Sequence, residues 1–123
     1  MKKLLFVGLM MLTSSAWAEW VIFSKDEEAT FYYDPATIRK DGNTRRVWTL
    51  QNLKQRHADG EMSRRGRMEY DCKQERFQVL DISQHSEPMA GGKVLTVEIG
   101  SGTWRGIAPG TINESILNIV CAK

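Results

Sequence analysis

The stretch Met62–Cys72, with the sequence MSRRGRMEYDC, decides the fold class that we predict for this chain. Apolar and charged side chains alternate along it with a period of two residues, which is the spacing of a β-strand with one buried and one hydrated face. The residues expected on the core face are Met62, Met68, Tyr70 and Cys72, and those expected on the hydrated face are Arg65, Arg67, Glu69 and Asp71. The rest of the chain therefore has to supply a sheet and an element that covers one side of it.

Five further strands are predicted on either side of this stretch, because β-branched and aromatic residues there are bounded by turn signals. They are expected at residues 20–25, 30–34, 44–53, 77–82 and 94–99. In the last of these strands, Leu95, Val97 and Ile99 are expected to point inward. The polar residues 55–61 indicate a loop between two of the strands.

The C-terminal segment changes period and predicts a helix. Thr111 lies three residues before Glu114 and follows the pair Pro109-Gly110, which is the pattern of a capping box at a helix N-terminus. Apolar residues continue at helical spacing, at positions 112, 116, 117, 119 and 120. Several strands with no helix between them indicate antiparallel pairing. The predicted fold class is α+β, with a single antiparallel β-sheet of about six strands and one C-terminal helix packed on one face.

The N-terminal segment has the composition of a secretory signal peptide. Two lysines precede the apolar run at residues 4–12, and Ala16-Trp17-Ala18 offers small residues at the spacing of a cleavage site before Glu19. A transmembrane anchor is the alternative, but the apolar run is shorter than the roughly 20 residues that span a bilayer. We therefore expect a signal peptide at residues 1–18 and one domain at residues 19–123.

Export changes what the charge of the chain implies. The chain has 17 basic and 15 acidic residues, but the signal peptide would remove two of the basic ones and none of the acidic ones. The exported domain is therefore expected to be neutral, and no nucleic-acid partner is predicted. No cysteine near the cleavage point offers a lipid anchor, and no second apolar span is expected. We expect a periplasmic protein, with the cell surface or secretion as the alternatives.

Cys72 and Cys121 are the only two cysteines. In an oxidising compartment, an even pair of cysteines in a small domain usually forms a disulfide. The bond would join the C-terminal helix to the end of the strand that carries Tyr70, which is also the packing that the apolar stripe of the helix requires. A reactive or metal-binding thiol is the alternative, but there is no Cys-x-x-Cys pair and no histidine at ligand spacing. We predict a disulfide.

No group of residues has the pattern of a catalytic site. His57 and His85 fall in predicted loops, and neither is placed beside an activated nucleophile. Glu69 and Asp71 share a strand face, as the carboxylates of a glycosidase could, but the arginines interleaved with them favour charge pairing across strands. We predict that the protein is not an enzyme, and that it has no catalytic residues, no cofactor and no metal site.

The segment from Arg39 to Arg67 has a marked charge bias, with nine basic residues against three acidic ones. Clustered arginines hold carboxylates or sulfates through paired hydrogen bonds, so a glycosaminoglycan or an acidic protein surface is a candidate partner. A merely solvated strand face is the alternative interpretation. The candidate binding patch consists of Arg39, Lys40, Arg45, Arg46, Arg64, Arg65 and Arg67.

Several short motifs, in order along the chain, resemble the surface-adhesin protein E family, small exported proteobacterial proteins named after a Haemophilus adhesin. The resemblance extends over essentially the whole expected domain. The motifs that carry it are Trp20, Tyr32-Tyr33-Asp34-Pro35-Ala36-Thr37-Ile38, Asp41-Gly42-Asn43, Val47-Trp48, Glu69-Tyr70-Asp71-Cys72, Trp104, Ile107-Ala108-Pro109-Gly110 and Cys121.

The resemblance implies an antiparallel sheet with a packed helix and a disulfide, and it implies a homodimer. The founding adhesin binds host matrix and plasma proteins such as vitronectin, laminin and plasminogen, so an adhesin-like binding protein with partners of this kind is expected. Its binding segments have no short motif that aligns here, and no binding residue is carried over. The founding adhesin is a surface lipoprotein, whereas this chain lacks the lipidation cysteine. The alternative function is a housekeeping or inhibitor-type domain with a partner inside the envelope.

Overall fold

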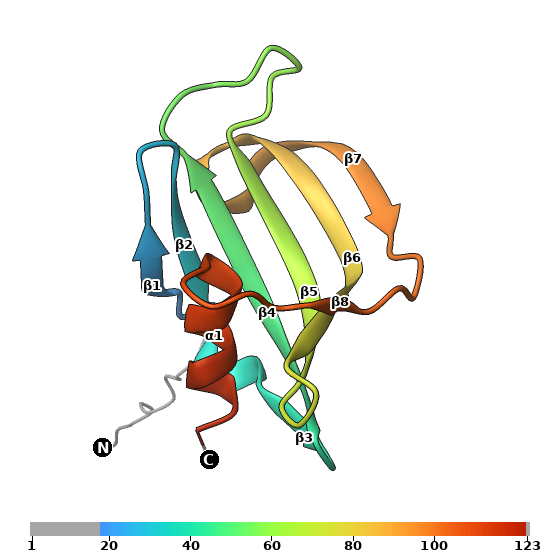
Figure 1. The fold of residues 1–123 in the computed structure, drawn as a ribbon. Helices are drawn as coiled ribbons and strands as arrows, with labels where there is room; N and C mark the ends of the chain where they lie inside the picture. Colours follow the sequence, from blue (N-terminus) through green and yellow to red (C-terminus); the bar gives the residue numbers. More distant parts are fainter. Residues whose placement is uncertain (1–17, 123) are drawn as a thin grey trace, which may run out of the picture.

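The computed structural model describes residues 18–122, which form one curved antiparallel sheet with a helix against it (Figure 1). Six strands follow one another in the order β1-β2-β4-β5-β6-β7, while β3 pairs with β4 and β8 pairs with β6. The strands are β1 (Val21–Lys25), β2 (Ala29–Tyr33), β3 (Arg39–Asp41), β4 (Thr44–Leu53), β5 (Ser63–Asp71), β6 (Arg76–Glu87), β7 (Gly91–Ile99) and β8 (Arg105–Gly106). The helix is α1 (Ile112–Val120), and two 3-10 turns are η1 (Pro35–Thr37) and η2 (Pro88–Ala90). The predicted fold class is confirmed.

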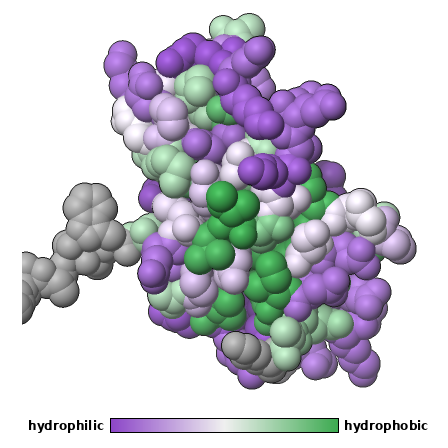
Figure 2. Space-filling model, turned by 90° about the vertical axis from the view of Figure 1, so that its left-hand side faces the viewer, coloured by the Kyte–Doolittle hydropathy of each residue, from purple (hydrophilic) through white to green (hydrophobic). Residues whose placement is uncertain are grey.

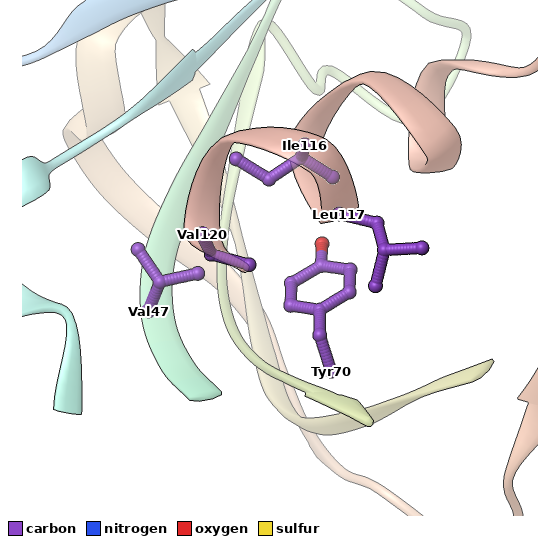
Figure 3. Packing of buried hydrophobic residues seen from close by; sticks show 5 residues of the cluster. All are labelled: Val47, Tyr70, Ile116, Leu117 and Val120. Carbon is purple, nitrogen blue, oxygen red and sulfur yellow. The ribbon is translucent and has the colours of Figure 1, made fainter. Parts of the chain in front are cut away.

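The hydrophobic core lies between α1 and the middle of the sheet (Figure 3). The side chains of Val47 on β4 and Tyr70 on β5 meet those of Ile116, Leu117 and Val120 on α1, and none of the five is more than 5% exposed. The ring of Tyr70 points from the sheet toward the helix. We call the side of the sheet that carries this core the helix face.

The N-terminus of α1 begins with the predicted capping box. Thr111 Oγ1 accepts a hydrogen bond from the backbone N–H of Glu114 at 3.2 Å. The side chain of Glu114 in turn accepts one from the N–H of Gly110 at 2.8 Å. These bonds satisfy N–H groups that a helix start leaves without partners, and they fix where the helix begins.

The predicted disulfide between Cys72 and Cys121 is confirmed, with a distance of 5.7 Å between the two Cα atoms. Cys72 comes directly after β5, and Cys121 is the residue at which α1 ends. The bond therefore attaches the C-terminal end of α1 to the same strand whose Tyr70 lies beneath the helix.

The prediction that Glu69 and Asp71 face water is wrong. They are only 8% and 7% exposed. Glu69 accepts a hydrogen bond from the Gln78 side chain on β6 at 2.9 Å and lies 3.4 Å from Arg46 on β4. Asp71 is paired with Arg76 at 3.0 Å. Because β5 has a neighbouring strand on each side, long polar side chains from both neighbours cover the carboxylates that the alternation alone places in solvent.

The expectation that Leu95, Val97 and Ile99 point inward is wrong for the last two. Val97 is 65% exposed and Ile99 is 79% exposed, whereas Leu95 is half-buried. Their strand, β7, ends the sheet and pairs only with β6, through a register that shifts around His85. The helix packs at the other end of the sheet, so no element within residues 18–122 covers this part of β7 (Figure 1).

The strand β6 continues five residues beyond its predicted end at residue 82. Its polar extension pairs with β5 as far as the partners Ser63 and His85. His85 is therefore a strand residue and only 3% exposed, which corrects its predicted place in a loop. Backbone hydrogen bonds from a neighbouring strand stabilise a polar segment that shows no strand pattern of its own.

The predicted signal peptide lies, apart from Ala18, outside the described residues. Within residues 18–122, no helix is both long enough and apolar enough to cross a bilayer.

Candidate functional site

Arginine side chains gather on the face of the sheet opposite α1. Residues 46 and 48 of β4 alternate with the core residue Val47 and so point away from the helix. The cross-strand register places Arg39 beside Arg46 and Arg67 beside Trp48. We call this surface the arginine face and define it by Arg39, Arg46, Trp48, Arg65 and Arg67.

Trp48 lies at the centre of the arginine face. The guanidinium carbon of Arg65 is 5.2 Å from the centroid of the Trp48 ring, and that of Arg67 is 6.0 Å away, both within the range of cation–π attraction. Arg67 is also paired with Asp81, at 2.9 Å between Nη2 and Oδ2. Arg65 makes no ion pair and no hydrogen bond within residues 18–122, so its charge is available to a partner.

The other three residues of the predicted patch lie elsewhere. Lys40 and Arg45 are paired across the β3–β4 hairpin on the side of the sheet where α1 packs. Arg45 is only 8% exposed and donates to the backbone carbonyls of Gly42 and Thr44 at 3.0 and 2.9 Å. Arg64 also points to the helix face. The fold therefore brings four of the seven predicted residues together and separates the other three from them.

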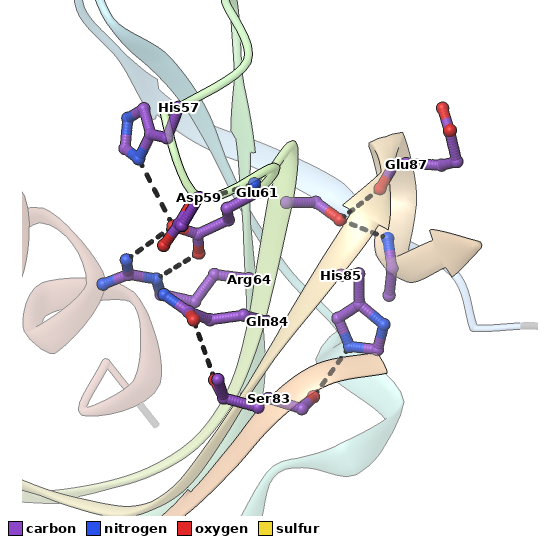
Figure 4. Close-up of polar contacts among 11 residues, drawn as sticks. His57, Asp59, Glu61, Arg64, Ser83, Gln84, His85 and Glu87 are labelled. Atoms are coloured by element: carbon purple, nitrogen blue, oxygen red, sulfur yellow. Dashed lines mark hydrogen bonds and ion pairs between the residues drawn. The ribbon is translucent and has the colours of Figure 1, made fainter. Parts of the chain in front are cut away.

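Glu61 is a buried carboxylate, 1% exposed, that lies between Arg64 and His57 (Figure 4). Arg64 donates to both of its oxygens, at 2.8 Å from Nε and 2.9 Å from Nη2. His57 Nδ1 lies 3.3 Å from Glu61 Oε1. The hydrogen bonds with Glu61 raise the pKa of Arg64 above its ordinary value. The charge of Arg64 is therefore balanced by Glu61 within the protein.

A group of residues that could hold a cation surrounds the same carboxylate. In the loop between β4 and β5, ligand atoms of His57, Asp59 and Glu61 lie within 4.8 Å of one another, and no other such group occurs in residues 18–122. One imidazole and two carboxylates form a donor set that divalent transition metals accept. Arg64 already holds both oxygens of Glu61, so a cation would have to displace this guanidinium.

A hollow of about 380 Å³ opens beside the arginine face. Its wall is formed by Ala18, Trp20, Trp48, Arg65 and parts of the turn at residues 34–37. Ala18 is the last residue of the predicted signal peptide, and the other lining residues stay in the chain after cleavage before Glu19. The turn forms hydrogen bonds with both backbone groups of Trp48. The N–H of Asp34 donates to the carbonyl of Trp48 at 3.1 Å, and the N–H of Trp48 donates to Thr37 Oγ1 at 3.0 Å. These bonds hold the turn and the strand in a fixed relation, so this part of the wall exists before any ligand binds.

A second hollow, of about 410 Å³, lies on the helix face. It is lined mainly by apolar side chains, among them Phe23, Phe31, Met68 and Ile82. A helix of nine residues covers only part of the sheet, which leaves this space beside it. The cation that lines it is Arg64, whose charge Glu61 already balances.

Hydrophobic side chains are exposed along both edges of the sheet. On β1, Val21 is 39% and Ile22 is 53% exposed, and on β7, Val94, Val97 and Ile99 are between 56% and 79% exposed. Figure 2 shows the side on which β1 lies, where hydrophobic residues gather in the middle with hydrophilic residues around them. Within residues 18–122 neither edge pairs with a further strand, and an edge of this kind is a candidate surface for contact with another protein.

His85 is a buried titratable group on the face opposite the helix. Its Nε2 lies 2.7 Å from Ser83 Oγ (Figure 4), and its Nδ1 is buried without a partner in the described chain. Burial lowers the pKa of His85 below its ordinary value, and the charge of Arg65 acts in the same direction. The carboxylate of Glu61 opposes this shift. The folded protein therefore favours the neutral imidazole.

We expect the stability of the protein to fall as the pH drops through about 6.5, the ordinary pKa of histidine. Below this pH, His85 is protonated in the unfolded chain but still neutral in the folded protein, so proton binding favours the unfolded state. The loss of stability ends at the lower pH at which His85 is protonated in the folded protein as well. Thermal unfolding between pH 7.5 and pH 5 measures the effect, and His85→Gln should flatten the profile. Gln55→Ala, at an exposed position that carries no titratable group, is the control and should keep the slope. An unchanged profile in His85→Gln would contradict the expectation.

Sequence reasoning missed the two tryptophans as site residues. Trp20 and Trp48 stand out in the sequence only as members of separate short motifs. What joins them to Arg65 is the packing of the turn at residues 34–37 against β4 and the position of Trp20 directly before β1. No spacing along the chain signals that arrangement.

The comparisons with known proteins agree with this architecture. Residues 20–122 match the protein-family model described as Surface-adhesin protein E. Crystal form II of Haemophilus influenzae protein E is 14% identical, with a TM-score of 0.65 over 89% of this chain and 92% of that one. Its selenomethionine form is 13% identical, with a TM-score of 0.66 over 90% and 92%. Protein E from non-typeable Haemophilus influenzae is 13% identical, with a TM-score of 0.58 over 89% and 80%. No curated protein matches the chain.

Proposed function

Because the chain belongs to the surface-adhesin protein E family, we propose that it is a non-enzymatic, exported binding protein that engages an anionic partner through the arginine face. The partners that fit this proposal are host matrix or plasma proteins with acidic surfaces, and glycosaminoglycans. A signal peptide at residues 1–18 would direct the domain at residues 19–123 out of the cytoplasm, as proposed from the sequence.

The observation that carries the proposal is the presence of four arginines on a single sheet face, two of which, Arg65 and Arg67, lie over the ring of Trp48. Arg46 and Arg67 are each balanced in part by a carboxylate, at Glu69 and Asp81. Arg39 and Arg65 have no carboxylate partner within residues 18–122. Arginine guanidinium groups on a rigid strand recognise carboxylates and sulfates with little loss of conformational entropy.

We expect the protein to bind heparin or an acidic matrix protein with an affinity that falls as salt is raised. The double variant Arg39→Glu/Arg65→Glu should weaken binding by about tenfold or more, since two exposed ion pairs of up to about 1 kcal/mol each are lost and replaced by repulsion. Titration at several salt concentrations measures both effects. Arg105→Glu, at an exposed position on β8, is the control. Binding that ignores both salt and the double variant would refute the arginine face as the contact surface.

The alternative is a domain with a partner inside the envelope, contacted through the loop around Trp104. This loop has an anchored aromatic ring, because Arg76 lies 4.7 Å from the centroid of Trp104. Protease treatment of intact cells, beside cell fractionation, separates the two proposals. Loss of the protein on treatment supports the adhesin, whereas protection together with release by osmotic shock supports the periplasmic partner.

A homodimer is also proposed, through the edge strand β7. This strand has nine residues, no proline, and the exposed side chains of Val94, Val97 and Ile99. Two copies that pair antiparallel along β7 would cover these side chains and the unpaired backbone of the edge. Light scattering of the purified protein, with and without Val97→Lys, measures the oligomeric state directly.

A further inference from the structure

We propose that the hollow between Trp20, Trp48 and Arg65 binds a sugar ring that carries a carboxylate, such as a uronate of a glycosaminoglycan or a terminal sialic acid. This inference rests on the proposed function, because it names the chemical group that the arginine face would recognise. Three features of the hollow favour such a ligand: the charge of Arg65, the two indole rings of the wall and the side chain of Asp34.

Arg65 supplies the group that would bind the carboxylate. It lines the hollow and lies 5.2 Å from the centroid of Trp48, with no ion pair in the described chain. A guanidinium that stacks on an aromatic ring keeps its in-plane N–H donors free, and the stacking holds the plane in place. Two parallel hydrogen bonds to a carboxylate are the contact that such a group makes best.

The wall of the hollow suits a ring with both apolar and polar edges. Two indole side chains line it, and its volume of about 380 Å³ lies at the small end of the range of ligand pockets. The negative π-faces of indole rings attract the weakly positive C–H groups of a sugar ring. An aliphatic carboxylate would leave the polar part of the wall without a partner.

Asp34 is that polar part. It is only 6% exposed, and its Oδ1 accepts a hydrogen bond from the N–H of Ala36 at 3.0 Å. Its Oδ2 has no partner in the described chain and so remains an acceptor in the wall. A sugar hydroxyl can donate to this oxygen, whereas a ligand carboxylate would be repelled by it. Arg65 and Asp34 together would orient the ring, with its carboxylate at one residue and a hydroxyl at the other.

The part of the wall formed by the turn and Trp48 is also preorganised. The hydrogen bonds of Asp34 and Thr37 to the backbone of Trp48 hold the turn against β4, at 3.1 and 3.0 Å. A wall that is already ordered loses little entropy when a small ligand binds. This matters for a single sugar, whose contact area is small.

The test is a nuclear magnetic resonance titration of the purified exported protein with glucuronate, N-acetylneuraminate and glucose. The indole N–H signals of Trp20 and Trp48 should shift with both acids, and about tenfold less affinity is expected for glucose, because the charge-assisted bonds to Arg65 are lost. Trp104 also stacks on an arginine but does not line the hollow, so its signal is the internal control. The tighter of the two acids identifies the source of the ligand.

Variants make the test decisive. Arg65→Gln should remove the preference for the acids over glucose, and Trp20→Leu should weaken binding of all three sugars, while Arg105→Gln should change neither.

Equal affinity for glucose and the acids in the unaltered protein, or shifts at Trp104 as large as those at Trp20 and Trp48, would overturn the inference. If salt-sensitive heparin binding persists but no monosaccharide shifts the two signals, the inference fails while the proposed function stands. If the acids bind and heparin and matrix proteins do not, the proposed function fails instead.

Discussion

Replacing Cys72 and Cys121 together by alanine should lower the free energy of unfolding by about 4 kcal/mol, the chain-entropy estimate for a closed loop of this length. The two cysteines are 49 residues apart, and the loop between them contains β6, β7 and β8. Without the bond, the unfolded chain gains conformational freedom. The end of α1 then also loses its covalent attachment to β5. A loss of this size is a large part of the 5 to 15 kcal/mol that is typical of folded domains.

Urea unfolding of the oxidised protein and of the double variant measures this difference. The reduced form of the unaltered protein is the matched control and should unfold at the same urea concentration as the double variant. Substituting both cysteines avoids a single free thiol that could pair between molecules. A decrease below about 1 kcal/mol would contradict the chain-entropy account.

The second large effect is expected at Tyr70, which is 1% exposed beneath α1. Tyr70→Ala should lower the free energy of unfolding by about 3 to 5 kcal/mol, the range for removal of a buried aromatic ring. The ring contacts Ile116 and Leu117 in the core, and its centroid lies 6.3 Å from that of Phe77. The helix would then lie over a cavity that its own side chains cannot fill.

Tyr70→Phe is the control, because it keeps the ring and removes only the hydroxyl. Burial raises the pKa of this hydroxyl above its ordinary value, so the side chain is neutral in the folded protein and the control changes no charge. The loss of stability in Tyr70→Phe should stay within about 1.5 kcal/mol, because the packing of the ring is kept. Chemical unfolding of both variants decides the point. A loss in Tyr70→Phe as large as that in Tyr70→Ala would assign the effect to the hydroxyl instead of the packing.

The two effects should not be additive. Tyr70 and the disulfide both hold α1 against the sheet, and Tyr70 lies on β5 two residues before Cys72. Residues that stabilise the same packing are coupled, so the triple variant should lose less than the sum of the two separate losses. A fully additive result would mean that the disulfide stabilises the protein without helping the helix to pack.

Local patterns in the sequence predicted the elements that determine the fold. The alternation before Cys72 predicted β5, and the capping box at Thr111 with its apolar stripe predicted α1. The even pair of cysteines predicted the disulfide. Each of these signals depends on residues close together in the chain, or on a chemical property of one residue type in one compartment. These three predictions therefore do not depend on contacts between distant parts of the chain.

The exposure of the side chains on each strand could not be predicted from local patterns in the same way. Val97 and Glu69 obey the same period-two rule in the sequence, yet Val97 is exposed and Glu69 is buried. Glu69 has a neighbouring strand on each side, whereas β7 ends the sheet away from the helix. Exposure depends on strand order and on where the one helix packs, and neither is encoded in local alternation.

For the candidate site, local sequence is enough to show that arginines are concentrated between Arg39 and Arg67 and that the segment is rich in strand-forming residues. Which of these arginines lie on one face depends on how the strands pair and pack. Because successive strand residues point to opposite faces, Arg64 was turned toward the helix face and Arg65 toward Trp48. The hollow with Trp20 and the buried Asp34 arises from contacts between segments distant in the chain. Such contacts follow from register and packing, which depend on the whole fold at once.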